Sequence, residues 1–346
     1  DPVDPGRWHM SAIGDPHDWD TFPQVPSASQ AASSTSAKAG TVPDIINAIV
    51  PWTDDTLLFG GDSSIWSLSG DPMAGGVMDL VTDETGMSFG RPYCKDPSGS
   101  LWFFGSTGGL YLMQRGTIPQ RMSLGRIERQ LREVDLSAFY IQLQWNQMDE
   151  GVHIFQMPFG AGGTIVNHWF YEAKSGAFHK DKFGILGTDK IQPTAVIRLD
   201  GDTADDRTVL IGGEDGRIRQ WGKDSDGAIP KSDEQTTSAD IAIDSYILIG
   251  PLVNSPTEAA QQVTELDAVL SSSQNGCNFE IFSSDEPDVL GTPAATGSFL
   301  AGRNDKRLIR TSGDHVFIRL RNAKEGECWA FEGASALVSY GGEVRR

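Results

Sequence analysis

The sequence predicts an all-β protein, and three observations support this. Glycine and proline are frequent, with 39 and 18 residues among 346, and such breakers favour short elements joined by many turns. Helical periodicity is nearly absent: the best stretch is residues 126–143, whose second half is equally compatible with a strand. A hairpin pattern also recurs along the chain. Together these features favour a β-propeller built from about six four-stranded blades, with a multi-sheet β protein as the alternative.

The recurring pattern is an apolar run, a glycine-containing turn and a second apolar run. Phe59 aligns with Phe104, and Trp66 aligns with Tyr111. We expect the glycines to serve a positive φ or a close backbone approach in each turn. Repeat spacings of about 45 to 60 residues fit four strands with their turns. The aligned copies are "LLFGGDSSIW" (57–66), "WFFGSTGGLY" (102–111) and "VLIGGEDGRIRQW" (209–221), with a longer hairpin at 152–180.

The chain divides into two predicted regions. Residues 1–240 are assigned to the propeller blades, and within them the small, polar stretch 27–41, "SASQAASSTSAKAGT", is expected to be an exposed loop. Residues 241–346 are rich in strand-like segments. These strands either complete the ring or form a small β-sandwich beside it.

The chain is strongly acidic. Its 28 Lys and Arg residues and 47 Asp and Glu residues give a net charge of −19. This charge disfavours tight binding to nucleic acid or to anionic membranes. Two interpretations remain, a solvated surface and an acidic wall past which DNA slides. Basic residues cluster modestly near the C-terminus, at Arg303, Lys306, Arg307 and Arg310. In an acidic chain such a cluster suggests an interface with another acidic subunit.

No pattern predicts catalytic, cofactor-binding or metal-binding residues. The three cysteines, Cys94, Cys277 and Cys328, are too few and too widely spaced for a disulfide framework or a zinc ribbon, and we expect them to be reduced. The six histidines form no zinc motif, and no nucleophile or phosphate-loop motif is present. We therefore predict no cofactor and no enzymatic activity. Calcium binding by the acidic cluster Asp200, Asp202 and Asp205 stays open, although solvated turn aspartates are the simpler interpretation.

No apolar run is long enough to span a membrane, and no signal peptide is evident. Because the chain begins at Asp1 rather than at Met, we expect the natural protein to continue before it.

One turn resembles the Asp box of sialidases. "CKDPSGSLWFF" (94–104) places Asp96, Gly99 and Trp102 at the spacing of that turn. Such turns are structural and recur in non-enzymes. A sialidase also needs an arginine triad, but no spacing distinguishes the candidates Arg91, Arg198 and Arg319. A glycan-binding or sialidase-like propeller acting at a host cell surface is nevertheless retained as the alternative function.

Three segments carry a resemblance to a known family. They are "RWHMSAIGDPHDWDTF" (7–22), "IVPWTDDTLLFGGDSSIWSLSGDP" (49–72) and "TSGDHVFIRLRNAKEGECWAFEGASALVSYGGEVRR" (311–346). Together they resemble the tail nozzle, or hub, proteins of short-tailed and related bacteriophages, which include packaged-DNA stabilisation proteins.

The resemblance implies a structural protein of the virion tail, synthesised in the host cytoplasm. Such a subunit would form a homo-hexameric ring below the portal and adaptor proteins and support tail fibres or spikes. The ring would continue or close the DNA channel and let duplex DNA pass without tight binding. The family contributes no catalytic residues, and no membrane insertion is expected.

Overall fold

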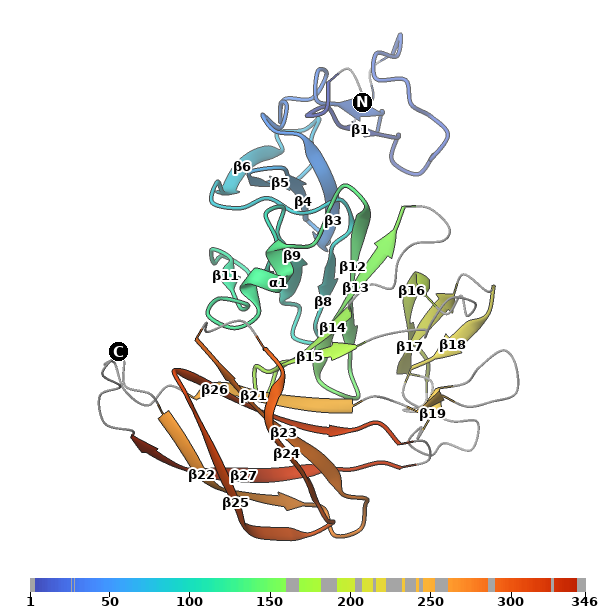
Figure 1. Ribbon diagram of the computed structural model, residues 1–346. Helices are drawn as coiled ribbons and strands as arrows, with labels where there is room; N and C mark the ends of the chain where they lie inside the picture. The colour runs from blue at the N-terminus through green and yellow to red at the C-terminus, as the bar shows by residue number, and fades with distance from the viewer. Residues whose placement is uncertain are drawn as a thin grey trace. The chain divides into compact units, whose positions relative to one another are not determined.

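The computed structural model describes residues 4–25, 27, 29–159, 168–181, 192–202, 207–213, 216–221, 232–233, 241–242, 245–252, 261–285, 290–324 and 327–340. The chain separates into two compact units, Asp1–Trp221 and Gly222–Arg346 (Figure 1). The sequence-based division lies at residue 240. Within the described residues the structure is almost entirely β, with one short helix, α1 (Glu128–Arg132), so the all-β prediction is confirmed.

Four sheets follow one another along the first unit. Strands that are neighbours in each sheet are also consecutive in the chain and antiparallel, which is the topology of a meander. The short strand β7 (Gly90–Arg91) is the exception, because it joins the third sheet by pairing in parallel with β12. The sheets are β3 (Ile46–Thr53), β4 (Thr56–Gly61), β5 (Ile65–Ser69) and β6 (Val77–Thr82); β8 (Tyr93–Lys95), β9 (Leu101–Phe104), β10 (Leu110–Met113) and β11 (Gln120–Arg121); β12 (Phe139–Asn146), β13 (Gly151–Pro158), β14 (His168–Glu172) and β15 (Phe178–Asp181); and β16 (Pro193–Asp200), β17 (Arg207–Gly213) and β18 (Ile218–Gln220).

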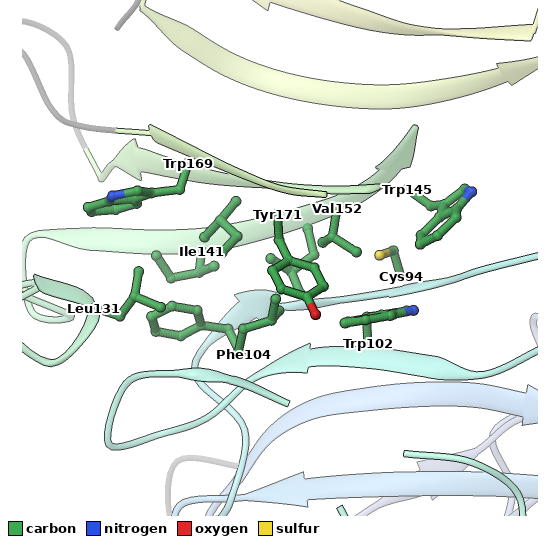
Figure 2. Close-up of a cluster of buried hydrophobic side chains, with 12 residues drawn as sticks. Cys94, Trp102, Phe104, Leu131, Ile141, Trp145, Val152, Trp169 and Tyr171 are labelled. Carbon is green, nitrogen blue, oxygen red and sulfur yellow. The ribbon is translucent and has the colours of Figure 1, made fainter. Parts of the chain in front are cut away.

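Each of these sheets shares a hydrophobic core with the next sheet along the chain. Leu58 of the first sheet and Phe103 of the second belong to one cluster. Phe104 of the second sheet and Ile154 of the third belong to another, which is drawn in Figure 2. A further cluster joins the third sheet to the fourth. The sheets therefore pack face to face in the order in which the chain forms them.

This packing buries both faces of the inner strands. All four residues of β9 are buried, and seven of the eight residues of β13 are buried. Within β9, Leu101 and Phe103 contribute to the core with the first sheet, whereas Trp102 and Phe104 contribute to the core with the third. Side chains alternate between the faces of a strand, so a strand covered on both sides tends to be apolar at successive positions, as β9 is at all four.

The recurring hairpins occupy equivalent places in these sheets. Segments 57–66, 102–111 and 209–221 lie in β4–β5, β9–β10 and β17–β18, which are the second and third strands of their sheets. In the first strand of these hairpins, the sequence-based alignment of residues was wrong by one position. Phe59 pairs with Trp66 and Phe103 pairs with Tyr111, so Phe59 corresponds to Phe103 rather than to Phe104.

Turn length explains this shift. Gly60 pairs with Ile65 in the first hairpin and Phe104 pairs with Leu110 in the second, so the second turn contains one more residue. A shift of one residue moves a side chain to the opposite face of its sheet. Two turn glycines illustrate the two expected reasons for glycine, which are a close backbone approach and a positive φ. A Cβ on Gly61 would lie 2.3 Å from a carboxylate oxygen of Asp44, and Gly109 has φ +106°.

The N-terminal segment covers the outer face of the first sheet. Trp8, Ala32 and Val42 share a core with Phe59 and Leu68, and β1 (His9–Met10) pairs with β2 (Ala32–Ser33).

This contact corrects the prediction that residues 27–41 form an exposed loop. Residues 31–34, at the centre of that stretch, are buried, although Thr35 and both ends of the stretch are exposed. Small side chains permit close packing against Trp8, and composition alone does not distinguish this from a solvated loop.

The last sheet of the series has one uncovered face. Val209 and Ile211 pack against the third sheet, whereas Ile197, Leu199 and Ile218 are exposed, at 57%, 44% and 75%. The described strands of the first unit comprise four sheets of this kind and do not close into a ring. The finer prediction of about six blades in a closed propeller is therefore not reproduced by the described topology.

The second unit contains two sheets that share one core, which is the arrangement of a β-sandwich. Leu266 and Ala268 of one sheet pack with Ile281 and Ile318 of the other. A separate short pair, β19 (Ser232–Asp233) and β20 (Ile241–Ala242), precedes them. In spatial order the sheets are β21 (Ser245–Leu252), β26 (His315–Asn322), β23 (Cys277–Ser284) and β24 (Pro293–Phe299); and β25 (Arg303–Gly313), β22 (Gln261–Leu270) and β27 (Phe331–Tyr340).

All three cysteines are free, and Cys94 and Cys277 are buried. Burial raises the pKa of the Cys277 thiol to about 11, which makes it a poor nucleophile at neutral pH. Among the described residues, no helix is long and apolar enough to cross a membrane.

Candidate functional site

The candidate site is a shallow hollow of about 450 Å³ at one end of the third sheet. It is formed by the turn between β12 and β13, by β14, and by the turn that leads into β15. Its walls are mostly polar, with carboxylates, one amine and one imidazole beside an aromatic ring. The lining residues are Met148, Asp149, Glu150, Phe170, Glu172, Lys174 and His179.

Strand register brings three of these side chains to one face of the sheet. Phe170 and Glu172 are two residues apart on β14, and His179 of β15 lies directly opposite Phe170. Residues two apart on a strand point the same way. The rings of Phe170 and His179 are stacked with their centroids 6.2 Å apart. The intervening Tyr171 points to the opposite face, into the core of Figure 2.

The tip of the β12–β13 hairpin supplies two further carboxylates. Glu150 has φ +49°, a conformation that few non-glycine residues adopt. Its carbonyl accepts a hydrogen bond of 3.0 Å from the backbone N–H of Ala173. A Cβ on the next residue, Gly151, would lie 2.3 Å from the Phe170 ring. The tip is thus fixed against β14, and the carboxylates are held at the rim of the hollow.

A hydrogen-bonded chain leads from the rim into the buried interior. The side-chain amide of Asn146, a buried residue, donates to Asp149 Oδ2 at 2.7 Å and lies 3.2 Å from His153 Nε2. Because the amide nitrogen is a donor, His153 Nε2 accepts and the ring proton sits on Nδ1. His153 Nδ1 lies 3.9 Å from Asp181 Oδ2.

His153 is held neutral beneath the hollow. It is 1% exposed and packs between aromatic rings, with centroids 4.6 Å from Phe170 and 4.4 Å from Trp221. Burial lowers the pKa of His153 to about 3, with a smaller contribution from His168. At neutral pH the imidazole therefore supports the site as an uncharged hydrogen-bonding group.

The Asp-box-like turn is a structural element, as expected. Asp96 Oδ1 accepts hydrogen bonds from the backbone N–H groups of Ser98 and Ser100, and Asp96 Oδ2 accepts one of 3.1 Å from the indole of Trp102. Gly99 supplies φ +82°. The turn closes the β8–β9 hairpin and does not contribute to the hollow.

The three candidate arginines of a sialidase-like triad are divided between the two units, with Arg91 and Arg198 in the first and Arg319 in the second. Arg319 lies in the second unit, where it pairs with Glu280 and stands 4.9 Å above the Phe282 ring. Arg198, in the first unit, pairs with Asp200.

The ion pair between Arg198 and Asp200 also concerns the possible calcium cluster of Asp200, Asp202 and Asp205, because it occupies the carboxylate of Asp200. Asp205 lies outside the described residues. Within the described part of the chain, no group of three or more His, Cys, Asp or Glu side chains is placed to hold a metal ion. Sequence reasoning missed all the residues of the hollow, because they come from separate strands. The acidic pair before Gly151 was the only local signal.

No family model matches this chain, and no curated protein matches it. Several solved structures do match. An exo-β-1,3-galactanase from Phanerochaete chrysosporium, solved with β-1,3-galactotriose, is 5% identical, covers 82% of this chain and 78% of its own, and has a TM-score of 0.30. A glycoside hydrolase family 32 β-fructofuranosidase from Bombyx mori is 12% identical, with 96% and 88% coverage and a TM-score of 0.32. The extracellular domain of a hybrid two-component system from B. thetaiotaomicron is 10% identical, with 85% and 44% coverage and a TM-score of 0.26.

These matches correct one prediction. The expectation that this chain is not an enzyme was wrong and is withdrawn, because two of the three matches named are glycoside hydrolases. The low TM-scores mean that the likeness says nothing about the substrate or the chemistry of this chain.

Proposed function

We propose that the chain binds glycans through the hollow at the end of the third sheet. The observation that carries this proposal is the placement of Phe170 and Glu172 on one face of β14, with Asp149 and Glu150 at the rim. An aromatic ring offers an apolar surface to the C–H face of a sugar. Carboxylates accept hydrogen bonds from the sugar hydroxyls, and an ammonium group donates hydrogen bonds to them.

The rigidity of the rim supports the same proposal. Binding costs less when the polar groups are already fixed. Asp149 is held by Asn146, and Glu172 accepts a hydrogen bond from Ser175. A shallow, open, polar hollow suits an extended oligosaccharide better than a small apolar ligand, which would be buried in an apolar pocket.

Titration with oligosaccharides of several linkage types, including β-1,3-galactan and fructan fragments as probes, tests this function. We expect Glu172→Gln and Asp149→Asn each to weaken binding by about tenfold, as for loss of one charged hydrogen-bond partner. Asp79→Asn is the matched control, because Asp79 is exposed on β6, away from the hollow. Binding that survives both hollow variants, or the absence of binding to a broad glycan array, would refute the proposal.

Sugar release should be measured in the same samples, because hydrolysis also requires carboxylates near the scissile bond. Activity that disappears in Glu172→Gln would extend the proposal from binding to catalysis. Activity unchanged in both hollow variants would place the chemistry elsewhere.

A second candidate function is that of a tail nozzle or hub subunit in a bacteriophage virion. It is supported by the three segments that resemble that family and by the net charge of −19. In this reading the four stacked sheets are consecutive blades of a β-propeller, and copies form a hexameric ring with portal, adaptor and fibre proteins. Duplex DNA passes through the ring. Electron microscopy of particles from a producing host tests it, since the chain must then occupy a ring in the tail.

A further inference from the structure

The core of the β-sandwich is incompletely covered at one end. Nearly all of its half-buried apolar side chains belong to β21, to β27 or to Trp329, which lies just before β27. Trp329 donates a hydrogen bond of 2.7 Å to Ser245 of β21, so these two edge strands lie at the same end. Apolar side chains that gather half-exposed at one place favour a contact with another molecule. They are Ile249, Leu252, Trp329, Phe331, Ala336 and Val338, and the one such residue elsewhere in this cluster is Ala295 of β24.

The edge strand at this end, β27, lacks the usual protection against pairing with another strand. Among the described strands it pairs only with β22. From Gly333 to Tyr340 it has no bulge of its own and no charged side chain. Ala334 is exposed although it lies opposite the buried Ala268, so the core-facing side of the strand reaches solvent. An edge of this kind is a template for strand addition.

The opposite edge of the same sheet, β25, is protected. Its pairing with β22 is interrupted by two register shifts, and Lys306 has φ +55° at one of them. Bulges and charged side chains are the devices that keep edge strands from pairing with other chains. In the other sheet, Pro251 on β21 and Pro293 on β24 each lack the N–H that a ladder requires. The cations of β25 are the basic cluster noted in the sequence: Arg303, Lys306, Arg307 and Arg310.

We propose that β27 of one copy pairs antiparallel with β27 of a second copy around a two-fold axis. The two three-stranded sheets then join into one sheet of six strands. Ala334, Ala336 and Val338 are the core-facing residues of β27, because each lies opposite a buried residue of β22. Pairing even-numbered positions with even-numbered positions keeps these residues of both copies on the core side. The contact is isologous and closes at the dimer. This inference goes beyond the proposed glycan binding and does not depend on it.

The charges beside this seam permit two copies of a chain with a net charge of −19 to meet. The acids of the solvent-facing side, Glu265 and Asp267, lie on β22, one strand away from the seam. Those of the two copies are therefore separated by three strand spacings, at least about 14 Å. This distance exceeds the Debye length of about 8 Å at physiological salt, so their repulsion is largely screened.

Charge complementarity favours a second copy of this chain as the occupant of the edge. Glu332, at the start of β27, is exposed. Antiparallel pairing carries the residues that follow Tyr340 of one copy past Glu332 of the other copy. Arg345 and Arg346 belong to that segment of the sequence, which lies outside the described residues. The two-fold axis repeats this attraction at both ends of the seam.

Sedimentation velocity of the full chain from about 1 to 100 µM tests the contact. We expect a monomer–dimer equilibrium without larger species, because the two-fold contact uses the free edge of both copies. Leu337→Asp should raise the dissociation constant at least about tenfold, since like charges close together across a strand pair repel. Leu308→Asp is the matched control and should dimerise as the wild type does. Leu308 and Leu337 lie opposite the same residue, Glu265, from the two edges of the sheet, and are 79% and 57% exposed.

Hydrogen exchange supplies a second readout on the wild-type chain, so that the test does not depend on how a variant folds. The backbone N–H groups of β27 that point away from β22 should become protected as the dimer forms. Those of β25 should exchange at the same rate in monomer and dimer. Peptides covering 331–340 and 303–313, compared at about 1 and 100 µM, measure the difference.

Three outcomes would overturn the proposal. A wild-type chain that stays monomeric at every concentration would show that β27 does not pair with itself. Dimerisation of equal strength in Leu337→Asp, without added protection of β27, would place the interface elsewhere. A monomer in which β27 is already fully protected at about 1 µM would show that another segment of the same chain covers the edge.

Discussion

Strands of the two units are buried in different ways. In the first unit an inner strand such as β9 lies between two other sheets, and all of its residues are buried. In the second unit a strand such as β25 packs on one side only, so that Ile309 is 4% exposed and its neighbour Leu308 is 79% exposed. The difference shows that one sheet can belong to two cores at once, and that its stability then depends on both neighbours.

The strongest test of this comparison is to truncate two adjacent residues of β9. Phe103→Ala and Phe104→Ala should each lower the free energy of unfolding of the first unit by about 3 to 5 kcal/mol, because each removes a buried ring and leaves a cavity. The two losses should be nearly additive, since the rings lie in different cores. Urea unfolding followed by tryptophan fluorescence measures them. If either substitution were neutral, β9 would be covered on one side only.

The corresponding pair in the second unit should behave unequally. Ile309→Ala should destabilise the β-sandwich by about 2 to 5 kcal/mol, whereas Leu308→Ala should change its stability by no more than about 0.5 kcal/mol. Hydrogen exchange of peptides from β22 to β27, measured on dilute protein, separates the two. Equal protection losses would contradict one-sided burial.

A further test concerns the acid sensitivity that histidines buried in their neutral form give the first unit. Burial lowers the pKa of His168 from 6.5 to about 3, and His168 Nδ1 accepts a bond of 3.1 Å from the backbone N–H of Gln156. The unfolded imidazole takes up a proton below about pH 6.5 but the folded one does not. Stability is therefore present above pH 6.5 and is lost as the pH falls towards 3, by up to about 1.4 kcal/mol per pH unit for each histidine.

His168→Gln keeps a hydrogen-bond acceptor but cannot titrate. Its unfolding free energy should therefore fall less steeply between pH 6.5 and 4 than that of the wild type. The matched control is His17→Gln, because His17 is exposed in the N-terminal segment. If the slopes of the His168 variant and the wild type coincide, His168 is not buried in its neutral form.

The features that the sequence predicted are the local ones. The hairpins could be found because a strand, its turn and the returning strand are contiguous, and the copies occupy the same place in successive sheets. Their residue register could not be found, because one added turn residue exchanges the faces of Phe103 and Phe104. The hollow was not predictable either, since Glu150 and Phe170 meet only through the pairing of β13 with β14.

The sequence also could not predict which individual aromatic side chains are buried. Trp8 and Trp19 stand in one short, polar segment, yet one is buried and the other is exposed. The distinction arises from Trp8 packing near Phe59, at a centroid distance of 6.2 Å. Phe59 lies about fifty residues away in the chain, and no local sequence pattern predicts this contact.

The stacking order of the sheets also has a consequence for synthesis. Because each sheet packs on the one made just before it, the first unit can assemble as the chain leaves the ribosome, and bacterial or eukaryotic elongation at about 5 to 20 residues per second gives each sheet seconds to form. At every stage, however, the newest sheet presents a bare apolar face until its successor emerges. Ile197, Leu199 and Ile218 show that face on the last sheet of the series. A ribosome that stalls between sheets would therefore hold a nascent chain that chaperones recognise, and the most vulnerable stall would follow residue 121, when Trp102 and Phe104 are formed but uncovered.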